Sequence, residues 1–551
     1  MARKCKNGEF KKKTPEQIAL EEYRKNANRH VLVVEVITQL KYVYRIFHDA
    51  ELLRKAGNKL TAIMVKRMEQ LFRTKEYRRL KSLYAKALKD DNESAREAVA
   101  EELDALREKY NVTWDYCRKS MELIRVQFGI NSIFTLTRAE DIWHGVEKCL
   151  FGGGETIHFR KRGDLPSIRA KQNNRGIPIS VKNGEIEIRY DRIPFHLTYD
   201  PKDRFLSTEI DKMRTYLSNA KDWDTKASNA WVKEKRIIDT FRPCYVTLVP
   251  KVIRGKYRLF AHITIEAKAT PKLDKAGNPR HSYGQGVVGC DIGTQTIAYT
   301  SDAKVELKNL AERGSSISYR ERRQRLLNRA MDRSRRATNP ENYNEDGTIK
   351  KGKKTWKYSK HYFKLRKKYN NLSRINAENR HLAINEDINH IRSIGDVFVT
   401  EPKNADKLAR RAKKTTRNKK GKYNRKKRFG RSIQNRCPGY FQAQAQKIFE
   451  STGGSYHEVP NSYRASQYDH TADDYFKKSL STRLYNLKDG TSVQRDCYSS
   501  FLLYCYNIPQ ESIDKTRCVN MFPVFIKMEE QKIAAIIHNR LKVMNSGIKV
   551  S

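Results

Sequence analysis

The chain lacks the features that mark secreted, membrane-spanning and disulfide-built proteins. Its nine cysteines are scattered, odd in number and never form a C-x-x-C pair, so reduced thiols in a cytoplasm are expected rather than a disulfide framework. The apolar stretch over residues 30–40 is interrupted by polar side chains and falls well short of the roughly 20 residues that span a bilayer. The amino end lacks the apolar segment of a secretory signal. These absences predict a cytoplasmic protein without a membrane partner.

Acidic residues are also scarce. The 551 residues include 112 Lys plus Arg but only 63 Asp plus Glu, which gives a formal net charge of +49. Solubility needs a net charge of magnitude roughly 2–8 in a small domain, and a chain with this much charge repels itself until a polyanion neutralises it. A solvated cationic surface and an anionic membrane surface are the alternatives, but the charge balance favours nucleic acid.

The residue pattern predicts a multidomain α+β protein. Apolar residues recur at helical spacing before residue 128, and alternating segments follow a glycine run at 152–154. The segment 256–266 alternates most clearly and predicts a half-buried antiparallel strand in a barrel-like domain. The predicted parts are a basic arm over 1–30, a helical domain over 31–150, a β-rich domain over 151–270 with a helix near 203–220, a linker over 271–286, an α/β domain over 287–501, and a tail over 502–551 with a helix near 529–544.

Three acidic residues stand where charge is costly. Asp291 ends an apolar strand and is followed by Gly293 and a return strand over 296–300. Glu401 ends a second short apolar strand, before a proline, and Asp496 opens a helix of small and apolar residues. Taken singly, each has a plainer interpretation: a turn-capping Asp, a surface Glu at a strand end and a helix N-cap.

Together the three acids describe the acid set of an RNase H-like nuclease. Phosphodiester hydrolysis builds negative charge on the attacking and leaving oxygens, and two Mg²⁺ ions about 3.5–4 Å apart stabilise both. Carboxylate oxygens are the ligands that such hard ions prefer. The sequence therefore predicts a catalytic and metal-binding site in which Asp291 bridges both ions while Glu401 and Asp496 each complete one ion's shell.

Residues 287–501 resemble the RuvC domain of TnpB, the transposon-encoded RNA-guided nuclease, and of the similar compact type V CRISPR effectors. The three acids stand in the order of the RuvC motifs, and residues 335–370 are similar to the basic connector between the first two motifs. The resemblance implies an RNA-guided, Mg²⁺-dependent DNA endonuclease in which Mn²⁺ can replace Mg²⁺. Its partners would be a guide RNA and a target DNA, either double-stranded with a short flanking motif or single-stranded, in a prokaryotic cytoplasm. The helical and β-rich domains would then be the recognition and wedge domains.

The sequence departs from this family in one segment. TnpB proteins usually carry a four-cysteine zinc finger between the second and third acids, whereas the segment at about 461–491 has no cysteine pair. Structural zinc needs four Cys or His ligands, so we expect a degenerate insert without zinc. Tyr463, Tyr468 and Tyr475 are the residues expected to replace the metal by packing.

Basic segments near the acids are the predicted nucleic-acid contacts. A helix after the hairpin carries arginines at three- and four-residue steps, and residues 407–431 hold 14 basic residues and no acid. A solvated helix face, a solvated basic run and a core role for the aromatic residues remain alternatives. The candidate contacts are Arg322, Arg325, Arg329, Lys353, Lys354, Trp356, Arg410, Arg411, Lys413, Lys414, Arg425, Lys426, Lys427 and Arg428.

Two other functions compete with a guided nuclease. A catalytically silent RNA-guided DNA-binding repressor could use the same scaffold, although all three acids are present. A transposase that joins DNA strands could use the same RNase H-like fold without a guide RNA. The residues themselves support a nuclease, and the guide comes from the resemblance.

Overall fold

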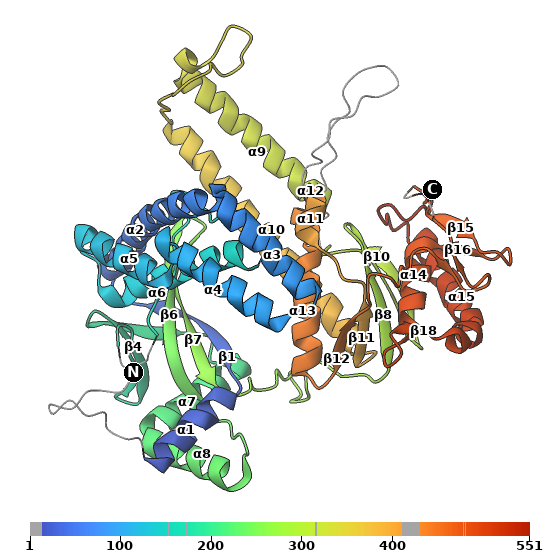
Figure 1. Cartoon of the computed structure of the whole chain (residues 1–551), viewed down its shortest axis with the longest axis horizontal. Coiled ribbons are helices and arrows are strands. Elements are labelled where there is room, and N and C mark those ends of the chain that lie inside the picture. Colours follow the sequence, from blue (N-terminus) through green and yellow to red (C-terminus); the bar gives the residue numbers. More distant parts are fainter. Residues whose placement is uncertain are drawn as a thin grey trace. The chain divides into compact units, whose positions relative to one another are not determined.

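The computed structural model describes residues 14–409 and 430–550, apart from 153, 172–174, 314–316, 478 and 480. The chain divides into two compact units, Met1–Asn278 and Pro279–Ser551, here called the amino-terminal and carboxy-terminal units. The division falls inside the segment 271–286 that the turn residues predict as a linker. Figure 1 shows the helices and strands of both units along the sequence.

The amino-terminal unit is built on one antiparallel seven-stranded sheet, in the order β2-β6-β7-β1-β5-β4-β3. The edge strand β3 also contacts β6, so the sheet curls on itself. The long pair β6 and β7 contains the segment 256–266, which is the predicted half-buried strand. The strands are β1 (His30–Ile37), β2 (Ile168–Arg169), β3 (Ile179–Lys182), β4 (Glu185–Tyr190), β5 (Ile193–Thr198), β6 (Arg242–Ile253) and β7 (Lys256–Glu266).

The start of the predicted helical domain is wrong at β1. The sequence predicts helix from residue 31, but His30–Ile37 lies between β7 and β5 in the sheet. Leu32, Val34 and Val36 are buried and the residues between them face outward, which is the two-residue period of a strand. This run of β-branched residues therefore follows the strand period and not the helical one.

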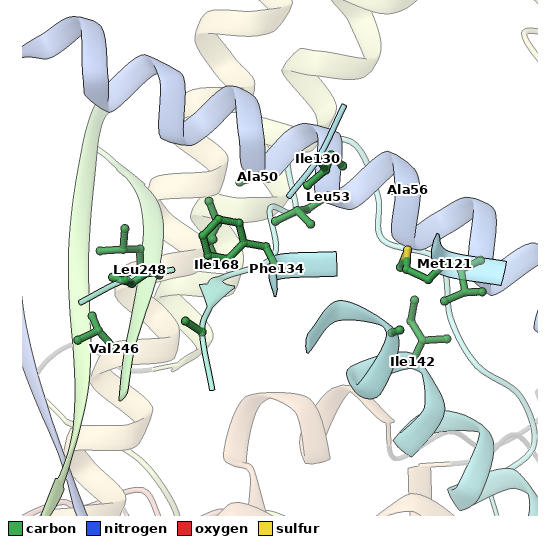
Figure 2. Close-up of a cluster of buried hydrophobic side chains, with 14 of the residues drawn as sticks. Ala50, Leu53, Ala56, Met121, Ile130, Phe134, Ile142, Ile168, Val246 and Leu248 are labelled. Carbon is green, nitrogen blue, oxygen red and sulfur yellow. The ribbon is translucent and has the colours of Figure 1, made fainter. Parts of the chain in front are cut away.

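Helices cover the sheet and close the core of this unit. Figure 2 shows side chains of α2, α5 and α6 meeting those of β2 and β6, with Leu53, Met121, Phe134, Ile168 and Leu248 all buried. The helix predicted near 203–220 is confirmed as α7. The helices are α1 (Pro15–Asn26), α2 (Leu40–Arg73), α3 (Lys75–Lys89), α4 (Glu93–Lys109), α5 (Trp114–Phe128), α6 (Ser132–Leu150), α7 (Arg204–Ser218) and α8 (Ala220–Glu234).

Part of the predicted basic arm is an ordered helix. Thr14 caps α1: its hydroxyl oxygen accepts a hydrogen bond from the Gln17 amide, and the Gln17 side-chain oxygen accepts one from the Thr14 amide. This reciprocal pair is a capping box. Tyr23 is fully buried, and its hydroxyl donates to the Ile238 carbonyl at 2.6 Å. Residues 15–26 therefore belong to the amino-terminal unit.

The carboxy-terminal unit holds a mixed five-stranded sheet in the order β10-β9-β8-β11-β12. Strands β10, β9 and β8 pair antiparallel, whereas β8, β11 and β12 pair parallel. Its strands are β8 (Val287–Ile292), β9 (Thr296–Thr300), β10 (Val305–Asn309), β11 (Val397–Thr400) and β12 (Ser455–Glu458). Short two-stranded ladders follow: β13 (Tyr468–Asp469) with β14 (Asp474–Tyr475), β15 (Leu484–Asn486) with β16 (Ser492–Gln494), and β17 (Tyr506–Asn507) with β18 (Ser512–Ile513).

Both faces of this sheet are covered. One face packs against the helices α10 and α13 through buried residues such as Ile384, Ile388 and Phe441. The other face packs against α14, which in turn packs on α15 through Phe501 and Phe525, whose ring centroids are 4.6 Å apart. The helices are α9 (Ile317–Thr338), α10 (Lys360–Arg392), α11 (Ala405–Ala409), α12 (Gly430–Arg436), α13 (Pro438–Ser451), α14 (Arg495–Tyr504) and α15 (Lys515–His538), with the 3₁₀ turn η1 (Pro340–Asn342).

The predicted tail begins inside a helix. The boundary placed after residue 501 cuts α14, and the helix expected near 529–544 starts earlier and ends earlier, as Lys515–His538. Because Phe501 and Phe525 share one buried cluster, residues 502–538 pack in the same core as the sheet. The tail is thus a structural part of the carboxy-terminal unit.

Candidate active site

Asp291 lies at the end of the central strand β8, on the face that α14 covers. Val288, Cys290 and Ile292 point into the cluster formed with α10 and α13, so the strand period turns Gly289 and Asp291 to the opposite face. The hairpin to β9 closes where the Gly293 amide donates to the Thr296 carbonyl at 2.8 Å. The predicted strand, turn and return strand are confirmed.

Glu401 follows β11, the parallel neighbour of β8. Thr400 pairs in register with Cys290, and its hydroxyl donates to the Cys290 carbonyl at 2.8 Å. Glu401 therefore comes one position after this pair, as Asp291 does on β8. Side chains two positions apart on a strand face the same side, so Glu401 shares the face of Val399. Val399 belongs to the buried cluster on the α14 side of the sheet. The main-chain amide of Ala465 donates to the Glu401 carboxylate.

Asp496 lies in the first turn of α14, and Gln494 caps this helix by accepting from the Cys497 amide at 2.8 Å. The middle and end of α14 pass directly over Gly289, since a Cβ built there would lie 2.3 Å from the Ser500 carbonyl oxygen and 2.1 Å from the Tyr504 amide nitrogen. The helix therefore places its first turn toward the end of β8 that carries Asp291. A helix amino terminus with its unpaired N–H groups favours negative charge at that point.

The charge of Asp291 reaches both of the other carboxylates. Burial raises the pKa of Asp496 to about 6, and repulsion by Asp291 adds to the rise. Burial and the same repulsion raise the pKa of Glu401. Nearby cations oppose these shifts; Arg483 lies 3.6 Å from Asp496, whose side chain is 14% exposed. The fold thus brings together acids that are 110 and 205 residues apart along the chain from Asp291, as the differences 401 − 291 and 496 − 291 show.

Lys403 is a site residue that the sequence reasoning missed. Its ammonium lies 3.0 Å from Asp291 Oδ1 and also donates to the Ile292 carbonyl. Burial by itself lowers the pKa of this lysine, but Asp291 and Glu401 outweigh the burial and hold the pKa above its ordinary value. The one signal in the sequence is its position two residues after the second acid, which is not distinctive in a chain with 112 Lys plus Arg.

The donor set fits Mg²⁺ in its chemistry. Three carboxylates supply hard oxygen ligands, and burial, with the charge of Asp291 second, raises the pKa of Glu401 and Asp496, a cost to the charged forms that a bound cation would offset. Among the residues that the structure describes, no three His, Cys, Asp or Glu side chains already meet closely enough to hold a metal ion. The Lys403 ammonium contacts Asp291 directly, and its positive charge opposes the rise in the pKa of Glu401 and of Asp496.

The arginine helix predicted after the hairpin is α9. Arg322, Arg325 and Arg329 are all exposed on it. Figure 1 shows α9 beside α10, and the Gln324 amide donates to the Ser373 hydroxyl at 3.1 Å between the two helices. The position of these arginines on one exposed helix allows contact with a phosphate backbone, and the contact itself stays a prediction.

The basic connector engages its own aromatic residues. The Arg335 guanidinium lies over the Trp356 ring, 5.0 Å from its centroid, and the Trp356 ring packs edge-on against Tyr343. Contacts within the protein therefore already occupy part of the Trp356 ring. Lys353 is exposed, and Lys354 donates to the Gly352 carbonyl. The predicted contacts in the basic run, namely Arg410, Arg411, Lys413, Lys414, Arg425, Lys426, Lys427 and Arg428, lie outside the described residues.

Tyrosines pack inside the insert near 461–491. Tyr463 is buried and its hydroxyl donates to the Leu502 carbonyl, while the rings of Tyr468 and Tyr475 lie 5.1 Å apart. Tyr475 is the most exposed of the three, at 46%. His470 Nδ1 lies 2.7 Å from the Tyr498 hydroxyl. This packing agrees with the expected role of the tyrosines, and the absence of zinc stays a prediction.

Comparisons with known proteins give a weak structural likeness. No family model matches the chain, and no curated protein matches it. The chain is similar to two solved structures of the Cas12i1 R-loop complex, a selenomethionine derivative before target DNA cleavage and a complex after cleavage. Each is 10% identical with a TM-score of 0.25, and the alignments cover 91% and 95% of this chain but 66% and 65% of those chains. The chain thus spans just under two thirds of their length. Within the described ranges, no helix combines the length and apolarity that crossing a membrane requires.

Proposed function

We propose that the chain is an RNA-guided, Mg²⁺-dependent DNA endonuclease that cuts target DNA by phosphodiester hydrolysis at a RuvC-like site. The observation that carries this function is the placement of Asp291, Glu401 and Asp496 on one face of a mixed sheet, where burial first and the charge of Asp291 second raise the pKa of the other two. A cluster of partly buried carboxylates in a chain of charge +49 is costly unless it binds cations. A mixed sheet with acids at the ends of neighbouring parallel strands, facing a helix start, is the layout expected of an RNase H-like domain.

Each acid has a defined task in this function. Asp291 lies at the centre, since its charge acts on both other acids, and it would ligate two ions. Glu401 is held by the Ala465 amide and Asp496 by the first turn of α14, so each presents oxygens from a fixed element. Bound Mg²⁺ would activate water and stabilise charge on the phosphate oxygens. Mn²⁺ is expected to replace it.

The guide RNA and the target DNA are supported by charge and by the sequence resemblance. The net charge of +49 needs a polyanion, and α9 exposes a row of arginines in the same unit as the acid-bearing sheet. Guide pairing would read the target, while the protein would read a short duplex motif beside it. Phosphate contacts by α9 would position the duplex without selecting its sequence.

The RNA that copurifies with the protein tests the guided part of this function. The protein is expressed from its native locus, purified at moderate salt, and the bound RNA is sequenced. One discrete structured RNA with a variable end is expected, and a synthetic DNA matching that end should bind far more tightly than a scrambled DNA. Heterogeneous RNA and equal affinity for both DNAs would contradict guiding and leave a metal-dependent nuclease or a transposase.

A catalytically silent RNA-guided repressor is the second candidate. The observation that favours it is Lys403, whose ammonium already neutralises Asp291 at 3.0 Å. A repressor would bind a matched target and never cut it at any Mg²⁺ or Mn²⁺ concentration. Gel analysis of a matched, end-labelled DNA after binding distinguishes the two functions.

A further inference from the structure

The acid cluster contains its own cation. Lys403 Nζ contacts Asp291 Oδ1 at 3.0 Å and the Ile292 carbonyl, so both a side chain and the main chain hold the ammonium. The lysine side chain is 22% exposed and that of Asp291 is 15% exposed, which leaves solvent little room to screen the pair. An exposed surface pair would contribute little, but this pair is partly shielded.

The local sequence fixes the lysine at this point. Strand β11 ends at Thr400, and Pro402 stops the strand because proline has no N–H to donate to the sheet. Lys403 therefore leaves the strand end beside the carboxylate that ends the neighbouring strand β8. The parallel pairing of β8 and β11 is what makes this contact.

We propose that Lys403 is an internal counter-ion that holds the acid cluster together when no metal is bound and competes with Mg²⁺ for Asp291. This inference rests on the proposed function for the acids. An Asp291 oxygen that accepts from an ammonium cannot give the same lone pair to a metal ion, and two cations on one carboxylate repel each other. In the proposed function Asp291 ligates two ions through its two oxygens, so loading both ions displaces Lys403 from Oδ1.

Displacement couples metal loading to the substrate. The free ammonium has a four-carbon stem and can move to another anion, and the phosphodiester of a bound DNA strand is the anion that arrives at this site. Without nucleic acid, the protein then binds metal weakly. A bound DNA strand strengthens metal binding because its phosphate attracts the Lys403 ammonium away from Asp291. Two ligands that each favour the same displaced state of one residue bind with positive coupling.

Manganese binding by the full-length, nucleic-acid-free protein tests the inference. Bound Mn²⁺ is measured by electron paramagnetic resonance for the wild type, Lys403→Met, Lys403→Gln and Lys403→Arg. The Met and Gln variants are expected to bind Mn²⁺ at least about tenfold more tightly than the wild type, whereas the Arg variant keeps the charge and stays near it. Their melting temperatures should fall in EDTA and recover with Mn²⁺, because the metal replaces the missing cation.

Two controls separate the possible failures. Lys308→Met removes another partly buried lysine, which pairs with Asp387 at 2.5 Å away from the three acids, and should leave Mn²⁺ affinity unchanged. Asp291→Asn should abolish the tight Mn²⁺ site. Equal or weaker Mn²⁺ binding by Lys403→Met, with binding that depends on Asp291, overturns the counter-ion role alone. If Asp291→Asn binds Mn²⁺ with the same affinity as the wild type, the metal site itself is overturned.

Discussion

Gly289 is the point where the helix that carries one acid rests on the strand that carries another. It lies in β8 two residues before Asp291, and any side chain there meets the backbone of α14. A Cβ at this position would lie 2.1 Å from the Tyr504 amide nitrogen and 2.3 Å from the Ser500 carbonyl oxygen. Ordinary contacts begin near 3.4 Å, so α14 would have to move away by about 1 Å.

Gly289→Ala is therefore expected to be strongly destabilising. The neighbours are main-chain atoms of a packed helix, which cannot rotate aside as a flexible side chain can. Overpacking costs typically 1–3 kcal/mol, and we expect about 3 kcal/mol here because the shift also loosens the contacts of Phe501 with Phe525. Guanidinium unfolding followed by circular dichroism measures the loss in the transition of the carboxy-terminal unit.

Gly439→Ala is the matched control. It lies in the first turn of α13 in the same unit, and its added Cβ would sit 3.4 Å from the Ala405 Cβ, an ordinary contact. Alanine is favoured over glycine in a helix by up to about 1 kcal/mol, so this variant should be neutral or stabilised. A Gly289→Ala protein that loses less than about 1 kcal/mol would refute the close approach of α14 to β8.

The remaining predictions concern a buried acid and the arginine helix. Burial raises the pKa of Glu529 from 4.5 to about 8, so its contribution to stability is fully present below pH 4.5 and is lost as the pH rises through 8. Glu529→Gln should therefore match the wild type near pH 4.5 and become more stable than it by up to about 5 kcal/mol by pH 8, at about 1.36 kcal/mol for each pKa unit, as measured by unfolding across this range; a gain that does not change with pH would contradict the burial. Replacing Arg322, Arg325 and Arg329 together by Gln should weaken binding of duplex nucleic acid and lower the log–log salt slope by about 2.7, at about 0.9 for each lost phosphate contact, measured by fluorescence anisotropy in a salt titration. Arg118→Gln, on the exposed surface of α5, is the control, and an unchanged slope in the triple variant would show that α9 does not meet phosphate.

The sequence predicts the local parts of the site because short-range rules set them. The apolar run before Asp291, the glycine after it and the return strand at 296–300 are confirmed as β8, a hairpin and β9. The start of α14 at Arg495 agrees with Asp496 opening a helix. Strand parity also places Glu401 on the face of Asp291 once the two strands are known to be parallel neighbours.

Other features depend on contacts between distant segments. Lys403 gains its role only when β11 pairs with β8, and the pairing joins residues more than a hundred positions apart. Its two-residue distance from Glu401 does not distinguish it in the sequence, because it is one basic residue among 112. The strand at His30–Ile37 was open to prediction, since Leu32, Val34 and Val36 alternate, yet its partners β5 and β7 lie far along the chain. The long helix α2 begins at Leu40, so the helical pattern of the following residues dominates the sequence signal around this short strand.

Cleavage of a matched target by Asp291→Asn is the most direct test of the central claim. A supercoiled plasmid that carries a target matched to the copurified RNA is incubated with the wild type or the variant, in Mg²⁺ or in EDTA, and target binding is measured alongside. The wild type should cut in Mg²⁺ and not in EDTA, and Asp291→Asn should bind the target normally but cut at least about a hundredfold more slowly. Cutting by the variant at the wild-type rate, or cutting by the wild type in EDTA, would contradict a metal-dependent site centred on Asp291.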